Sequence, residues 1–429
     1  MSMFKRSAAL CACCLALVLP AAAADNPSAG KEPPKSWIDP DTGHRVIRLT
    51  DEPGSASLYF NDNSITPDGR DMVYTVRGGI SVLDLKTLES HPLVAAPARV
   101  IVVGRKTPTV YYTKAGADRD HVTLYGTNIE TGETRKVADL PRRASISSIN
   151  ADETLGGGTY IEGDGADYGA RPAAAAPALN QPRNKDESMD VRLQARLPMT
   201  LFTLDLRTGR QRNLIEHSTD WLNHLEFSPT DPTLLLYCHE GPWWKVDRLW
   251  TIRTDGTQNT LVHKRQMGME GVGHEFWSPD GKTIWYDIRF PIGVDFFLGG
   301  YNVDTQERIW YHMDLRSWSI HYNESADQTM FCGDGGSGSV VDWGTPENEW
   351  IYLLRPERIK DDETLGTNLI HPGTFRSERL VNMSKHKYTL EPNVFFTPDE
   401  KYVIFRSNMF GPTYVFAVEV AKASATAKN

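Results

Sequence analysis

The segment from Cys238 to Arg248 contains the side chains best suited to chemistry in this sequence. It combines a histidine, two carboxylates, a lysine and an arginine. A surface loop has no structural need of that mixture. A site that grips an anionic sugar and moves a proton does need a base and cations together. We therefore take this segment as part of a candidate site.

Similar polar groups recur around His274, His321 and His386, at matching places in a repeated unit. A single histidine beside a strand is usually a structural hydrogen-bonding group, and some propeller repeats carry one in each unit to hold a turn. Here the histidines gather in the last four repeats, together with Arg, Glu, Asp and Asn. That asymmetry favours one shared site over a repeated structural role.

A strand–turn–strand pattern repeats along the chain and indicates the elements that must position these residues. Pro-Asp-Gly or related turns separate apolar runs at 67–69, 229–231, 279–281 and 398–400, with degenerate copies at 148–153 and 322–327. Second hairpins are predicted over 82–93, 124–137, 201–214, 249–262 and 300–311. Two hairpins per unit of roughly 40 to 50 residues are typical of a β-propeller blade.

We count seven inner strands, which begin near Tyr59, Val100, Ile146, His224, His274, His321 and Asn393. The last unit lacks an outer strand, and residues 44–49 can supply it and close the ring. The sequence therefore predicts an all-β protein, a single seven-bladed β-propeller whose last blade is completed by an N-terminal strand. Two segments with little apolar periodicity, near 163–195 and 358–391, are predicted to be long loops.

The first 24 residues have the pattern of an export signal. A basic start precedes an apolar run over residues 8–19, and small residues precede an aspartate at position 25. The run is too short to span a bilayer. We expect cleavage near Ala24 and a mature domain of residues 25–429 that is periplasmic or secreted and has no membrane partner. A lipoprotein anchored through Cys13 or Cys14 is the weaker alternative.

Charge and cysteine content narrow the class of protein further. The net charge of −9 and the absence of a basic stripe argue against a nucleic-acid partner. Signal cleavage would leave only Cys238 and Cys332, which excludes a small disulfide scaffold. We expect these two thiols to be buried and unpaired at equivalent positions of separate repeats, although one disulfide is available. Packing between blades is the favoured interpretation for three tryptophans, namely Trp243, Trp244 and Trp318.

The inner strands of a propeller begin around its central channel, so the ring would bring residues from different blades together. On this basis we predict substrate contacts from five residues: His224, His239, Glu240, Tyr59 and Asn61. Imidazoles mixed with carboxylate and amide oxygens would suit a divalent Mn, Zn, Fe or Ni ion. Residues 25–429 contain no HExxH, CxxC, P-loop, GxSxG or EF-hand pattern, which removes the commonest activities that short motifs define.

These strings resemble the oligogalacturonate lyase family, the seven-bladed propeller pectate lyases. The resemblance extends over most of residues 42–417 and is most specific in 238–250 and 273–281. It implies cleavage of short uronic-acid chains by β-elimination to 4,5-unsaturated products, with a histidine base and a divalent metal, usually manganese. By motif, His274 would remove the C5 proton, Arg248 would bind the substrate carboxylate or stabilise developing charge, and His321 would be a metal ligand.

The sequence departs from the family's pattern in two places. Where the family has a His-Pro-His ligand pair in blade seven, this chain has Glu391-Pro392-Asn393. The resemblance then implies Glu391 and Asn393 as ligands, with His386 reaching in from the preceding loop. A family histidine in blade one is also absent from residues 57–61. A lyase for another uronate, such as a rhamnose- or glucuronate-containing oligosaccharide, therefore stays open.

Two other classes of propeller protein would contain the same Pro-Asp-Gly turns. A non-catalytic propeller of the TolB-like kind, binding a protein or a glycan, would not require Arg248, His274 and His321 to converge. A propeller hydrolase would use paired carboxylates such as Glu240 and Glu275 as acid and base, about 5 to 10 Å apart across the glycosidic bond.

Overall fold

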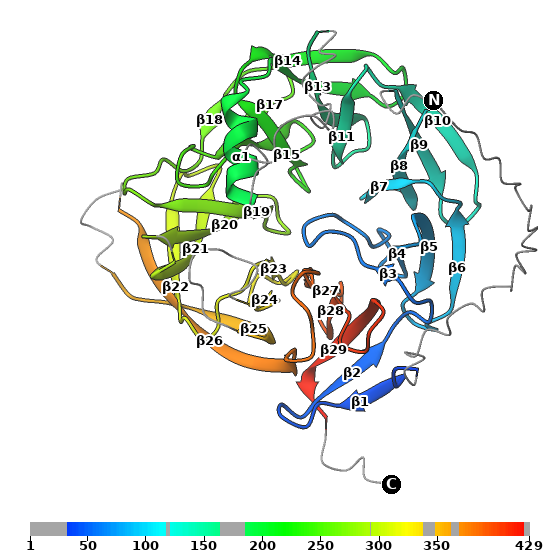
Figure 1. Cartoon of the computed structure of the whole chain (residues 1–429), viewed down its shortest axis with the longest axis vertical. Helices are drawn as coiled ribbons and strands as arrows, with labels where there is room; N and C mark the ends of the chain where they lie inside the picture. The colour runs from blue at the N-terminus through cyan, green and yellow to red at the C-terminus, as the bar shows by residue number, and fades with distance from the viewer. Residues whose placement is uncertain are drawn as a thin grey trace, which may run out of the picture. The chain divides into compact units, whose positions relative to one another are not determined.

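The strand–turn–strand units fold into small antiparallel sheets that follow one another around a common centre (Figure 1). The computed structural model describes residues 32–116, 121–163, 185–291, 293–337, 348–361 and 369–423, and residues 33–429 belong to one unit. The predicted export signal, residues 1–24, lies outside the described residues.

Four sheets have four strands each, and every strand is antiparallel to its neighbours. In chain order they contain β3 (Ser55–Ala56), β4 (Asp71–Val76), β5 (Gly79–Asp84) and β6 (Ser90–Val94); β7 (Arg99–Val103), β8 (Thr109–Ala115), β9 (Val122–Asn128) and β10 (Thr134–Asp139); β11 (Ala144–Ile149), β12 (Leu155–Ile161), β13 (Met199–Asp205) and β14 (Gln211–Ser218); and β15 (Trp221–Phe227), β16 (Leu234–Glu240), β17 (Leu249–Arg253) and β18 (Thr260–Leu261).

The other two sheets are larger. One contains β19 (Gly271–Trp277), β20 (Thr283–Phe290), β21 (Asp295–Asn302), β22 (Arg308–Met313), β23 (Tyr322–Glu324), β24 (Phe331–Gly333), β25 (Trp350–Arg358) and β26 (His371–Asn382). It is two four-stranded units whose outer strands, β22 and β26, pair in parallel. The other contains β27 (Phe395–Phe396), β28 (Tyr402–Ser407), β29 (Tyr414–Lys422), β2 (His44–Arg48) and β1 (Ser36–Ile38).

The N-terminal strand closes the ring. Strand β2 pairs with β29, which places Val46 opposite Val418, and β1 adds a fifth strand outside it. The chain therefore forms seven blades, which confirms the predicted all-β propeller and its closure by residues 44–49. The five predicted second hairpins are also present.

The Pro-Asp-Gly turns hold the inner strand of a blade to the next strand. In blade five the Ser278 hydroxyl donates to Asp280 at 2.6 Å, and the Lys282 N–H donates to the same carboxylate at 3.0 Å. Gly281 has a φ of 70°, which few other residues adopt without strain. Thr66 and Asp68 in blade one, and Thr397 and Asp399 in blade seven, repeat the hydroxyl–carboxylate contact.

The apolar core lies between the blades. One cluster joins Met72 and Tyr74 of blade one to Ile404 and Val415 of blade seven, and others fill the remaining gaps between neighbouring sheets. Each sheet is thus apolar on both faces, and burial of these faces stabilises the ring. Cys238 in β16 and Cys332 in β24 are buried and unpaired, as predicted, each in the second strand of its blade.

The two predicted long loops were wrong in part, because each contains an element of regular secondary structure. Within 163–195, residues Lys185–Gln194 form helix α1, whereas 164–184 lie outside the described residues. Within 358–391, residues His371–Asn382 form strand β26, which pairs with β25 as a long hairpin. None of the described helices is long and apolar enough to cross a membrane.

Candidate active site

The inner strands aim polar side chains at the centre by means of bulges. His224, His274 and Asn393 have φ values of 48°, 49° and 54°, which is unusual for residues with a side chain. In β15 and β19 the pairing register shifts directly after Asn223 and Gly273. A β-bulge of this kind redirects a side chain and is common next to active sites.

Arg248, His274 and His321 converge in the structure. The rings of His274 and His321 have centroids 4.7 Å apart, and the ring of His274 meets that of Trp243 at 4.9 Å. The Arg248 guanidinium carbon lies 5.1 Å from the Trp243 ring centre. Trp243 therefore contacts both Arg248 and His274, and His274 contacts His321, so the three residues belong to one cluster.

His321 is fully buried and held on both sides of its ring. Its Nδ1 lies 2.8 Å from Asp334 Oδ2, and its backbone N–H donates to the other oxygen of Asp334 at 2.8 Å. The remaining nitrogen, Nε2, lies 3.1 Å from the Tyr59 hydroxyl and 3.9 Å from Glu391 Oε2. Because Asp334 fixes Nδ1, the nitrogen that faces the site is Nε2.

Asn393 completes a set of donors beside His321. Its backbone N–H donates to Asp334 at 3.2 Å, and its side-chain oxygen is buried without a hydrogen-bond partner. Among the described residues, no three or more His, Cys, Asp or Glu side chains are grouped to hold a metal. His321, Glu391 and Asn393 are the predicted ligands that stay in this region, and Asn393 shares Asp334 with His321. An imidazole with carboxylate and amide oxygens suits Mn²⁺, and an orphaned buried oxygen is what such a site needs.

His386, the fourth predicted ligand, does not join this set. Its Nδ1 lies 2.9 Å from the Ser407 hydroxyl and its Nε2 lies 2.6 Å from the Leu390 carbonyl. Both ring nitrogens are thus used to fix the loop before blade seven. In this structure His386 is a structural residue rather than a ligand.

Glu240 links Arg248 to His224. The Arg248 guanidinium donates to Glu240 Oε1, and His224 Nε2 lies 2.7 Å from Glu240 Oε2. Burial acts to raise the pKa of Glu240, but the Arg248 and His224 cations hold that pKa well below its usual range. His224 Nδ1 is 3.6 Å from Glu275, and although burial opposes the shift, the two carboxylates raise the pKa of His224. The imidazole of His224 therefore lies between the carboxylates of Glu240 and Glu275.

His274 is held in its neutral form. Burial lowers its pKa to about 3, against the opposing effect of Asp287, whose Oδ2 lies 3.6 Å from His274 Nδ1. Asp287 is in turn bound by Arg289 at 2.7 Å. A neutral imidazole oriented by a carboxylate can accept a proton through its other nitrogen.

Trp243 lies against the site rather than in the core. It is half-buried, and the guanidinium carbons of Arg248 and Arg289 lie 5.1 and 5.0 Å from its ring centre. A Cβ on Gly273 would come within 2.6 Å of this ring, so the absence of a side chain there allows the contact. Trp318, by contrast, is fully buried, as expected.

Helix α1 supports the segment that carries Trp243. Lys245 pairs with Asp190 of the helix at 2.7 Å, and Arg192 lies over the ring of Trp221. The helix therefore steadies the loop between β16 and β17, a role that no sequence signal indicated.

The predicted substrate-binding residues divide between the site and its surroundings. His224, Glu240 and Tyr59 belong to the site, whereas His239 stacks on Trp250 at 4.9 Å and interacts with Asp220. Successive residues of a strand face opposite sides of the sheet, so His239 and Glu240 of β16 point toward different neighbouring blades. Asn61 bonds to Glu226 and to the Glu275 carbonyl, which places it beneath the site.

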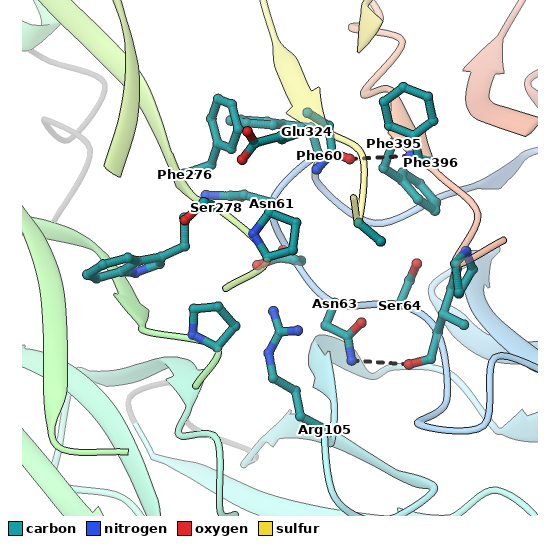
Figure 2. A pocket seen from close by; sticks show the side chains of 18 of the residues that line it. Phe60, Asn61, Asn63, Ser64, Arg105, Phe276, Ser278, Glu324, Phe395 and Phe396 are labelled. Carbon is teal, nitrogen blue, oxygen red and sulfur yellow. Dashed lines mark hydrogen bonds between the residues drawn. The ribbon is translucent and has the colours of Figure 1, made fainter. Parts of the chain in front are cut away.

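A second hollow follows further along the same inner strands. This cavity has a volume of about 190 Å³, and its walls include Asn61, Phe60, Phe276 and Arg105, which Figure 2 labels. Phe60 stacks on His321 with centroids 4.6 Å apart and meets Phe276 at 5.8 Å. These two rings separate the histidines from the cavity.

Comparison with known proteins matches this geometry to one family. A sequence profile described as oligogalacturonate lyase matches residues 194–424. An oligogalacturonate lyase of Dickeya dadantii (strain 3937) is 24% identical over 90% of this chain and 95% of its own length. An oligogalacturonide lyase of Pectobacterium atrosepticum is 26% identical over 51% of this chain, a match that spans only 55% of that relative.

A solved structure gives the same result for the fold. An oligogalacturonate lyase in complex with manganese superposes with a TM-score of 0.72 at 22% identity, covering 92% of this chain and 98% of that one. The family, the propeller fold and the enzyme class predicted from the sequence, a lyase, are thereby confirmed. With its profile match extending over more than half of its length, the chain belongs to the oligogalacturonate lyase family.

Proposed function

We propose that this protein cleaves short oligogalacturonides by β-elimination, with His274 as the base. The observation that carries the proposal is the position of the His274 imidazole, which packs between His321 and Trp243, while the guanidiniums of Arg248 and Arg289 lie over the same Trp243 ring. The relatives named above are lyases of this substrate class. The 4,5-unsaturated product follows from the elimination chemistry.

The chemistry requires a base and positive charge at one place. The C5 proton of a uronate is barely acidic, because the adjacent carboxylate is already negative. Cations beside that carboxylate stabilise the negative charge that develops as the proton leaves. His274 would accept the proton, Arg248 would meet the carboxylate, and Asp287 would hold the imidazolium that forms. The sugar linked at C4 then departs.

A divalent cation would be held by His321 Nε2, Glu391 and Asn393 Oδ1. The solved relative contains manganese, and three donors of these types suit that ion. Bound there, the ion would neutralise the substrate carboxylate as a Lewis acid. Asp334 orients His321 by its two contacts at 2.8 Å and orders Asn393 through its backbone.

The alternatives from the sequence find less support. A glycoside hydrolase needs room for the glycosidic bond between its two carboxyl groups, but the His224 ring lies between Glu240 and Glu275. A binding propeller gives no reason for Arg248, His274 and His321 to meet. A different uronate stays the second candidate, because Glu391 and Asn393 stand where the family pattern has histidines.

We also propose that the protein works outside the cytoplasm. The support is the pattern of residues 1–24, a basic start, an apolar run and a small-residue cleavage site. Buried, unpaired Cys238 and Cys332 lie in different blades and would be protected from an oxidising compartment.

The test is the ultraviolet absorbance of unsaturated uronate on trigalacturonate and other uronate oligosaccharides, with Mn²⁺ and with a chelator. We expect a metal-dependent rise on trigalacturonate, lost at least a hundredfold in His274→Gln. The matched control is His312→Gln, a half-exposed histidine far out on β22, which should keep full activity. A rise in absorbance only on other uronates would keep the elimination reaction and assign a different uronate as the substrate. No rise on any of them would overturn the proposal.

A further inference from the structure

The cavity of about 190 Å³ beyond the histidines has no role in the proposed reaction. It is lined by the later residues of the inner strands and by the turns that follow, such as 226–229, 276–279 and 395–398. Those residues lie two or more positions beyond His224, His274 and Asn393. Since a strand advances about 3.3 Å per residue, the cavity is a separate compartment of the channel.

Arg105 is the one guanidinium among the described residues that line this cavity. It comes from the turn after β7, and Figure 2 shows its head group directed into the hollow. It makes no hydrogen bond or ion pair of ordinary length with any residue that the structure describes, and its interaction with Glu226 is a longer-range attraction. A guanidinium placed in this way is free to bind a carboxylate through two parallel hydrogen bonds.

The neighbouring acids are less ionised near neutral pH than acids in water are, so they offset the Arg105 charge only in part. Burial raises the pKa of Asp62 to about 7 and that of Glu324 to about 8, and it raises the pKa of Glu226 well above its usual range. Arg99 and His224 act at longer range to lower the pKa of Asp62. A protonated carboxyl group donates a hydrogen bond, so these acids can serve hydroxyl groups of a ligand.

The walls combine flat apolar rings with amides. Phe60, Phe276 and Trp277 supply the rings, and Asn61 and Asn323 supply the amides. Aromatic faces opposite hydrogen-bonding groups suit a sugar ring, which has apolar C–H faces and polar edges. Pockets for drug-sized ligands measure about 300–1,000 Å³, so this smaller cavity takes a single ring.

We propose that this cavity is a second sugar site, which binds one acidic monosaccharide with its carboxylate on Arg105. The ligand class follows from the cavity's own side chains and does not depend on the lyase reaction. The site lies behind Phe60 and Phe276, so its occupant would not meet His274.

Calorimetric titration of the whole protein with D-galacturonate at pH 6.5 tests the proposal. We expect Arg105→Met to bind at least tenfold more weakly than the wild type, and Arg105→Lys to lie between them. The matched control is Lys106→Met, which removes an exposed cation of the same turn outside the cavity and should bind as the wild type does. Galactose, which has no carboxylate, should bind to the wild type at least tenfold more weakly than galacturonate does.

Unchanged galacturonate binding in Arg105→Met would overturn the proposal, as would equal binding of galactose. Melting curves of each variant check that the fold is intact, and Arg105→Lys keeps the test decisive if the methionine variant misfolds. The lyase assay separates the two proposals. A wild type without lyase activity would overturn the proposed function alone, whereas Arg105→Met should keep its turnover of trigalacturonate.

Discussion

At the scale of single residues, each reactive group depends on a carboxylate from another part of a blade. Asp334 holds His321, Asp287 faces His274, and Glu240 binds Arg248. Asp334 fixes which nitrogen of His321 faces the site, Glu240 keeps the Arg248 guanidinium in place, and Asp287 places a negative charge near His274 Nδ1. Substitutions in these partners should therefore affect separate properties of the site.

Asp334→Asn should weaken metal binding while leaving the base untouched. The amide cannot hold His321 Nδ1 and the two backbone N–H groups as a carboxylate does, so we expect a 10- to 100-fold loss of Mn²⁺ affinity. Electron paramagnetic resonance of free Mn²⁺ measures this without any substrate. Asp287→Asn is the control, since it should lower kcat and leave the Mn²⁺ dissociation constant unchanged. Equal metal affinity in Asp334→Asn and the wild type would refute the role of Asp334.

Arg248→Met should destabilise the fold as well as remove activity. Arg248 and Glu240 have side chains only 2% and 6% exposed, so the substitution leaves a buried charge without its main partner. Loss of one member of such a pair costs about 3–5 kcal/mol of unfolding free energy. Urea denaturation should show this loss, with part of it recovered in the double variant Glu240→Gln/Arg248→Met. If the double variant is no more stable than Arg248→Met, the unpaired charge of Glu240 is not the cause of the lost stability.

How much of the site could be predicted varied from residue to residue. The clustering of His274, Arg248 and His321 was predictable because His274 and Arg248 stand in the two most specific strings and His321 begins an inner strand. His239 was misplaced because two adjacent polar residues of a strand cannot face the same side. Asp287 and Arg289 were missed, although two charges two positions apart in the otherwise apolar strand β20 were a signal. Asp334 and Trp243 are placed by tertiary contacts that no local pattern shows.

At the level of elements, hairpins with a distinct turn could be predicted. A strand that also pairs with the preceding blade, and a helix without a strongly apolar face, could not. The sequence of strand β26, HPGTFRSERLVN, is polar over most of its length, so its pattern predicts a loop. It is a strand because it pairs with β25 on one side and with β22 of the preceding blade on the other. Helix α1 has no strongly apolar face, so no helical periodicity revealed it.

Ring closure by β2 should be essential to stability. Val46 is fully buried between β29 and its neighbours, whereas Arg45 on the same strand is half-buried on the other face. Val46→Asp would place an unpaired charge at the closing blade and should lower the unfolding free energy by about 3 kcal/mol or more. Arg45→Ala, the control, should change it by less than about 1 kcal/mol. Similar denaturation midpoints for the two variants would mean that β2 is dispensable.

At the scale of the whole molecule, the channel along the ring carries polar groups at two levels. The histidines, Arg248 and the metal donors form one level, and Arg105 with three acids forms the other. Between them, Phe60 and Phe276 keep the levels apart. Burial raises the pKa of these acids above that in an unfolded chain, and this links the stability of the molecule to pH.

Glu324 gives the clearest case of this linkage. Burial raises its pKa from 4.5 to about 8, so between these values the folded protein keeps a proton that the unfolded chain releases. Stability contributed by that proton is present in full below about pH 4.5 and is lost as pH rises through 8. In the wild type the Trp285 N–H donates a hydrogen bond to Glu324 at 2.8 Å. Glu324→Gln keeps an oxygen that can accept this hydrogen bond, but its side chain cannot ionise. We expect the variant and wild type to melt alike at pH 5 and the variant to be more stable at pH 8, by at most a few kcal/mol. A stability difference that does not change between the two pH values would show that Glu324 ionises freely in the folded protein.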